Sequence, residues 1–322
     1  MSGLRRQLIG VILVAAVAEC VLLRIALRLG PALPARVDVL PIFAIVEKLG
    51  VVALNVGVLA AAALLAIAAW DALERGRAGL PLALALLGAI LVNLALSSVV
   101  VAFPGGSIGL LHGAVTGAAI LLTLLSSSQT PGVRPALAGI GLAHGFALAQ
   151  SAGGGNVWLG GDVGAGWQPS VAAEIAAVMS ALILPWACRI RPRTREVVLA
   201  TAAGLGLTVA GTLQPWGLAT VAIWTMAFSL FLPPVVYGAA LTSILLTLLA
   251  LRRQPGGSEL AIGLTVIWLA GLKLDVSTFA LMALAGLTIA SAPTRPLGTE
   301  GGVGASRSHR RPPRALTRLV QW

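Results

Sequence analysis

Charged residues are scarce in this sequence. Asp, Glu, Lys and Arg together make up 10% of the 322 residues, against about a quarter in an ordinary soluble domain. So few charges cannot cover the surface of a soluble fold in water. Hydrophobic residues make up 58% of the chain, which excludes an intrinsically disordered protein as well. The composition therefore predicts a protein that is surrounded by lipid.

Cysteines and catalytic motifs are also few. The two cysteines, Cys20 and Cys188, fall near opposite faces of the expected membrane domain, so we expect no disulfide between them. The sequence contains no nucleophile elbow, phosphate-binding loop or His-Glu-x-x-His motif. We therefore expect no metal site of this kind, and we favour a protein that is not an enzyme.

Long apolar runs, separated by charge, proline or glycine, fill most of the chain. A membrane-spanning helix needs about 20 apolar residues, so the sequence predicts an all-α, polytopic integral membrane bundle of about ten transmembrane helices. The expected spans are residues 8–28, 45–70, 80–103, 108–128, 135–152, 169–188, 197–213, 216–251, 259–274 and 276–292.

The distribution of basic residues predicts the orientation. With the N-terminus inside and 216–251 crossing once, 17 of the 22 Lys and Arg residues fall on one side. Cytoplasmic loops of membrane proteins carry such an excess, so the net charge of +11 predicts topology rather than nucleic-acid binding. We expect both termini in the cytoplasm, and a multi-pass protein of the cell (plasma) membrane, which in bacteria is the inner membrane.

Residues 1–292 are expected to form the transmembrane domain, with 1–152 and 169–292 as two candidate halves. Residues 293–322 contain Pro, Gly, Ser and six arginines, and this composition predicts a disordered, basic cytoplasmic tail. The number and length of the spans resemble the layout of the ten-helix drug/metabolite transporter superfamily. No family motif is matched, so this resemblance implies no role for any residue.

Pro233 and Pro234 interrupt the run 216–251. A proline pair removes two backbone donors and breaks or kinks a helix. One interpretation is a simple kink or a tight hairpin. The other is a broken helix that lines a cavity and acts as a gate, as in transporters.

Ionisable residues at membrane depth are costly, so each is a candidate functional residue. Most of them fall at mid-depth or in the outer half, which predicts an outward-facing polar pocket. The alternatives are interfacial anchors, or carboxylates that are satisfied by a neighbouring helix. Glu174 is the preferred proton-linked group because it lies well inside an apolar span. The candidates for solute or proton binding are Glu174, Glu19, Glu47, Lys273 and Asp275.

His112 and His144 each stand in a Gly-x-x-His-Gly pattern, in consecutive antiparallel spans. Two neutral imidazoles that face each other could ligate a haem iron. The alternative is close helix packing along the small residues Gly109, Gly113 and Gly117, with the histidine hydrogen-bonded to a neighbouring helix.

These patterns favour a small-solute transporter or permease, for which no cofactor is expected and whose partners are the lipid bilayer and a small-molecule solute. The alternative is a membrane subunit of a larger, redox-linked complex that binds haem b through His112 and His144 and contacts other membrane subunits. No nucleic-acid partner is expected in either case.

Overall fold

Every secondary-structure element that the computed structural model describes is helical. The described residues are 2–22, 40–98, 107–127, 133–142, 167–213, 234–254, 257–270 and 276–292. Residues 134–142 are helical as well. The helices are α1 (Ser2–Glu19), α3 (Leu40–Leu73), the short 3-10 helix η4 (Gly76–Ala78), α4 (Leu80–Ser98), α5 (Ser107–Leu125), α7 (Trp167–Ala187), α8 (Thr194–Leu213), α10 (Pro234–Leu251), α11 (Gly257–Ala270) and α12 (Val276–Ala290).

The predicted all-α fold is thus confirmed for these residues, and each expected span corresponds at least in part to a described helix. The second span differs in length, because α3 is one continuous helix of 34 residues. At 1.5 Å per residue it is about 50 Å long. The described part of α10 is Pro234–Leu251. Pro233 and the preceding part of that span lie outside the described residues.

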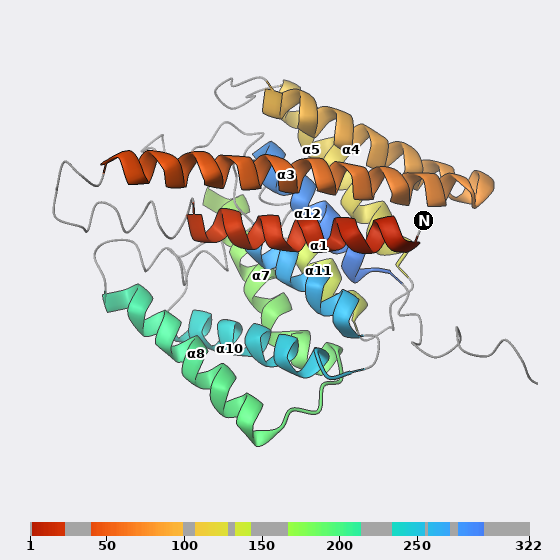
Figure 1. Cartoon of the computed structure of the whole chain (residues 1–322). Helices are drawn as coiled ribbons and strands as arrows, with labels where there is room; N and C mark the ends of the chain where they lie inside the picture. The colour runs from red at the N-terminus through yellow and green to blue at the C-terminus, as the bar shows by residue number, and fades with distance from the viewer. Residues whose placement is uncertain are drawn as a thin grey trace, which may run out of the picture.

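α12 is the central helix of the bundle. It packs against α3, α4, α5 and α11, and its residues from Leu281 to Leu287 are buried. A helix that is apolar on every side is expected in such a position. Figure 1 shows α12 behind α1 and α3, which run side by side in opposite directions.

α7, α8 and α10 form the other part of the bundle. α10 packs against both α7 and α8, and it reaches the central helices through α11. Figure 1 shows α8 and α10 together in green and cyan, away from α4 and α5. The division into halves 1–152 and 169–292 stays a prediction, and α11 and α12 pack with helices of the first half.

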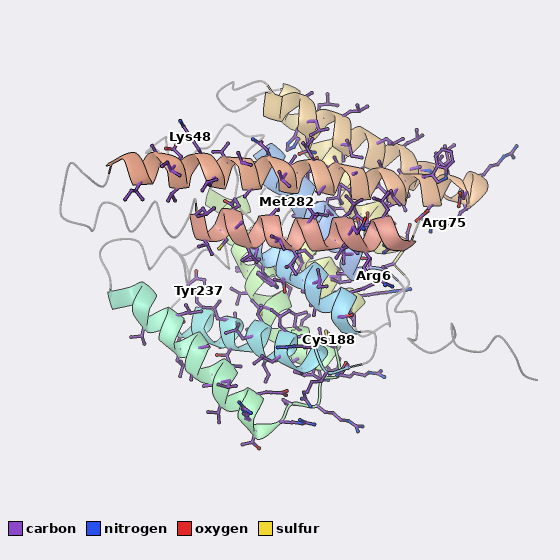
Figure 2. All side chains as sticks on the ribbon, viewed as in Figure 1. Arg6, Lys48, Arg75, Cys188, Tyr237 and Met282 are labelled. Carbon is purple, nitrogen blue, oxygen red and sulfur yellow. The ribbon has the colours of Figure 1, made fainter. Side chains whose placement is uncertain are left out.

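Basic residues gather at one end of the bundle, which we call the basic end. α1 begins there, and α3, α5 and α12 finish there, because Arg5, Asp71, Ser127 and Ser291 line one cavity. Figure 2 shows Arg6 and Arg75 at this end and Lys48 at the opposite one. Arg5 and Arg75 line the cavity at this end, and Arg134 donates to the carbonyl of the cavity-lining Ser127 over 2.9 Å.

The outer surface of the bundle is apolar. Trp186 is 79% exposed and Leu91 is 69% exposed, and large apolar side chains are exposed along most of the described helices. By length and composition, one helical stretch in the described part, Ala44–Leu73, could cross a membrane. Shorter apolar stretches of 10–17 residues lie in α4, α5, α7, α10, α11 and α12.

Candidate functional site

A cavity of about 410 Å³ opens at the basic end. Residues from α1, α3, α4, α5 and α12 line it, so helices from both ends of the described chain contribute to one site. The cavity lies between the first turns of α1 and α4 and the last turns of α3, α5 and α12. Its position therefore follows from the antiparallel arrangement of these helices and not from a local sequence motif.

Three charged side chains line this cavity: Arg5, Asp71 and Arg75. Arg5 and Asp71 are half-buried, and Arg75 is exposed. The Nε atom of Arg75 donates a hydrogen bond to the backbone carbonyl of Asp71 over 3.3 Å. Among the residues that the structure describes, neither Arg5 nor the Asp71 carboxylate is part of a salt bridge. The cavity therefore holds opposite charges that do not neutralise each other by direct contact.

Hydroxyl groups from α5 and α12 line the same cavity. Thr123 donates to the carbonyl of Ala119 over 2.7 Å, and Thr288 donates to the carbonyl of Leu284 over 2.8 Å. Both hydroxyls thus donate to their own helix and keep oxygen lone pairs as acceptors. Ser291 is 8% exposed, and its Oγ has no hydrogen-bond partner among the described residues. A buried hydroxyl without a partner costs free energy, so a ligand could satisfy it.

A second polar cluster joins α4 and α5 inside the bundle. His112 Nε2 lies 2.9 Å from Asn93 Oδ1, and Asn93 Nδ2 lies 3.1 Å from Thr116 Oγ1 and 2.7 Å from the Ala89 carbonyl. All three side chains are buried. Because the Asn93 amide nitrogen donates twice, its oxygen is the acceptor, and His112 donates through Nε2–H. The network therefore fixes the His112 ring against the neighbouring helix.

The close helix packing that the sequence predicted beside His112 does not occur at Gly117 among the described residues. A Cβ atom built on Gly117 would meet nothing within 4 Å among the described residues. Gly117 therefore does not mediate a close helix contact there, and the Asn93 amide engages His112 instead.

His144, the second candidate haem ligand, lies outside the described residues. The haem hypothesis stays a prediction, and no three His, Cys, Asp or Glu side chains gather in the described part of the chain.

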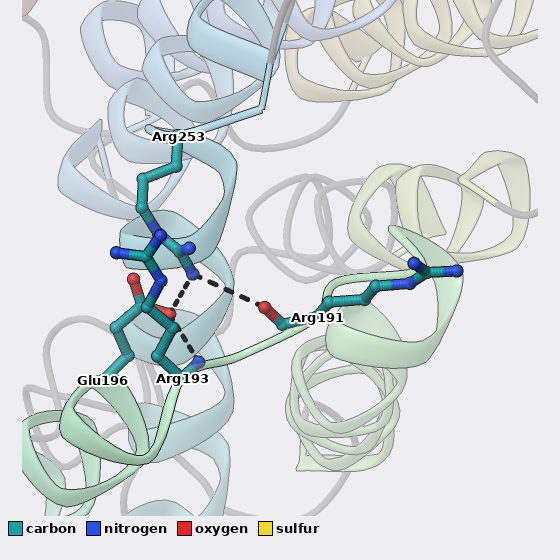
Figure 3. A network of polar contacts seen from close by, with 4 residues as sticks. All are labelled: Arg191, Arg193, Glu196 and Arg253. Atoms are coloured by element: carbon teal, nitrogen blue, oxygen red, sulfur yellow. Dashed lines mark hydrogen bonds and ion pairs between the residues drawn. The ribbon is translucent and has the colours of Figure 1, made fainter.

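A third polar cluster connects the start of α8 with the end of α10, as Figure 3 shows. Glu196 forms an ion pair with Arg253 and accepts a hydrogen bond from the backbone N–H of Arg193 over 2.9 Å. The second contact is one half of a capping box at the start of α8. Arg253 also reaches the carbonyl of Arg191 over 3.4 Å. The backbone N–H of Arg193, and then Arg253, lower the pKa of the Glu196 carboxyl group.

This lowered pKa predicts how stability depends on pH. Because the pKa of Glu196 is lower in the folded state than in the unfolded state, its contribution is present above the unfolded pKa. That contribution is lost as the pH falls through the folded value. We expect Glu196→Gln to lower the melting temperature at pH 7 and to lower it less near pH 3. Glu259→Gln, at an exposed position of α11, is the control. An equal loss at both pH values would contradict the assignment.

The structure places some of the predicted site residues and leaves others undescribed. Glu19 lies at the end of α1 and is 2% exposed, whereas Glu47 is exposed on α3. Glu174 lies in α7, but its side chain is outside the described part, as are Lys273 and Asp275. The proposed outward-facing pocket therefore stays a prediction, and so do the roles of these residues.

Sequence reasoning missed the cavity at the basic end. It counted Arg5 and Arg75 among the 17 basic residues of the cytoplasmic side, and it gave Asp71 no role. One signal in the sequence was Asp71 itself, a carboxylate at the edge of a long apolar run.

In comparisons with protein-family models, curated proteins and solved structures, nothing matches this chain.

Proposed function

We propose that this chain is a polytopic membrane protein that transports a small polar solute, and that the cavity at the basic end is its inward-facing mouth. One observation carries the proposal: a cavity with charged and hydroxyl-bearing walls inside a bundle with an apolar outer surface. Its volume of about 410 Å³ is in the range of small-molecule sites. Polar groups are costly inside a membrane protein, so their concentration in one cavity favours a role in binding.

The apolar surface supports a position in a membrane. Soluble proteins rarely expose large contiguous apolar areas, whereas this chain exposes apolar side chains on most described helices. The excess of arginine at the basic end favours a cytoplasmic location for that end. On this proposal the protein crosses the plasma membrane about ten times, both termini are cytoplasmic, and the cavity opens toward the cytoplasm.

The residues of the outer half complete the proposed pathway. Glu174 and Glu19 remain the proposed proton-linked carboxylates, and Glu47, Lys273 and Asp275 the proposed outer binding groups. Pro233 and Pro234 remain the proposed gate. A transporter opens a site to each side of the membrane in turn, so the inward cavity must narrow when the outer pocket opens.

Spin labels across the mouth of the cavity test this function. Arg6→Cys and Ser126→Cys would be labelled in a Cys20→Ala, Cys188→Ala background, and their separation measured by pulsed electron resonance in nanodiscs. Arg6 is exposed beside the cavity-lining Arg5, and Ser126 is exposed at the end of α5. We expect two distance populations, one for the open and one for the narrowed cavity, because alternating access moves these helices apart and together.

The pair Arg6→Cys and Glu74→Cys is the matched control. It shares one label but spans the tight α1–α3 contact, so a single narrow distance is expected. One narrow population for the cavity pair as well, unchanged between pH 5 and pH 8, would reject transport. That result would favour the alternative, a membrane subunit of a larger complex.

A further inference from the structure

The charges of the cavity at the basic end define the chemistry of its ligand. Arg5 and Asp71 are both half-buried and both line the cavity, yet no salt bridge joins either of them to a described residue. Arg75, the third charged side chain of the cavity, is exposed, and its Nε donates to the backbone carbonyl of Asp71. The side chains of Arg5 and Asp71 carry opposite charges without pairing, so each is available to a ligand. A ligand with a negative and a positive group would satisfy both.

The helix ends reinforce this division of charge. Arg5 stands in the first turns of α1, where the helix dipole is positive. Asp71 stands in the last turn of α3, Ser127 lies two residues beyond the end of α5, and Ser291 lies one residue beyond the end of α12. Three helix C-termini, with their partial negative charge, therefore meet at the cavity beside the carboxylate. Arginines already donate to two of the carbonyls there, Arg75 to Asp71 and Arg134 to Ser127, so the Asp71 carboxylate is the group that remains for a cation. This arrangement favours an ammonium group near Asp71 and a carboxylate near Arg5.

The remaining wall of the cavity is apolar. Leu64 and Ile67 of α3 and Leu82 and Leu86 of α4 line it, and Leu64, Leu82 and Leu86 are buried. An aliphatic side chain of the ligand would remove apolar surface from water against this wall. The unpartnered Oγ of Ser291 is then left to accept from, or donate to, the polar groups of the ligand.

We propose that this cavity binds a small zwitterion, an α-amino acid with an aliphatic side chain. Its carboxylate contacts the Arg5 guanidinium, its ammonium group contacts the Asp71 carboxylate, and Ser291 completes the polar site. The inference rests on the proposed function, because it names the substrate class of the same cavity. No bond is made or broken in this role.

Three ligands of matched shape test the inference on the full-length protein in nanodiscs. L-leucine carries both charged groups, 4-methylpentanoate lacks the ammonium group, and 3-methylbutylamine lacks the carboxylate. We expect saturable binding of L-leucine by titration calorimetry, and at least about tenfold weaker binding of the two analogues, because each leaves one charge of the cavity unpaired.

Substitutions on each side of the cavity complete the test. Asp71→Asn and Arg5→Gln should each weaken L-leucine binding by at least about tenfold, whereas Arg6→Gln, at the exposed neighbouring position, should leave it unchanged. Equal binding of either analogue, or no binding of all three ligands to the unmodified protein, would overturn the zwitterion site. If the spin-label distances still show two populations, the transport proposal stands and only the substrate class is wrong.

Discussion

Gly263→Ala is expected to force α11 and α12 apart and to be among the most damaging single substitutions in the described bundle. A Cβ atom at Gly263 would lie 2.5 Å from the Ala290 nitrogen and 2.6 Å from the Gly286 carbonyl oxygen. Both are backbone atoms, so no side-chain rotation relieves the clash. The helices must separate, and α12 also carries the contacts to α3, α4 and α5. We expect the free energy of unfolding to fall by about 1–3 kcal/mol or more.

Thermal unfolding in detergent, followed by size-exclusion chromatography, measures this effect. Gly117→Ala is the matched control, because a Cβ atom there meets nothing within 4 Å among the described residues. Alanine is also a better helix former than glycine by about 1 kcal/mol, so this variant should be at least as stable as the unmodified protein. Equal losses in the two variants would mean that α11 and α12 do not approach as closely as described.

His112→Leu is expected to have the second large effect, because it leaves the buried Asn93 Oδ1 without its donor. A buried polar group that loses its partner costs about 1–3 kcal/mol. Asn93→Leu removes the acceptor and leaves the His112 N–H and the Thr116 hydroxyl with one contact fewer. Replacing both partners removes the unpaired groups together, so the double variant should lose less than the sum of the two single losses.

A double-mutant cycle in denaturant, with folding followed by circular dichroism, measures the coupling between His112 and Asn93. Interhelical hydrogen bonds in membrane proteins average about 0.6 kcal/mol and reach about 1.7 kcal/mol, and we expect the coupling in this range. Thr247→Val is the control for losing a buried hydrogen bond that does not join two helices. This buried hydroxyl donates only to the Ser243 carbonyl of its own helix. Strictly additive losses for His112 and Asn93 would show that the pair is not coupled in the folded protein.

The helices could be predicted from the sequence more completely than the candidate site. Each described α-helix overlaps one of the predicted apolar runs, because a helix in an apolar environment satisfies its own backbone hydrogen bonds. The proline pair Pro233-Pro234 predicts a kink, a hairpin or a broken helix, and the choice among these stays a prediction because Pro233 lies outside the described residues. The proposed pockets were harder to locate, because residue depth along a span does not reveal which helices lie side by side.

The case of Asp71 and Ser291 illustrates this limit. They are 220 residues apart, and they meet in one cavity only because α3 and α12 end at the same side of the bundle. Likewise, the sequence marked His112 as a candidate ligand, but the packing of α4 against α5 gives it Asn93 as a partner. No local pattern could have predicted either pairing.

The sequence by itself determined the helical character of the chain, the apolar surface and the concentration of arginine in certain connections. These follow from composition and local periodicity, which act within one helix. The tertiary structure alone decided that Arg5, Asp71 and Ser291 share a cavity and that Gly263 must remain without a side chain. Both depend on which helices are neighbours and how closely they approach, and that is set by packing between segments far apart in the chain.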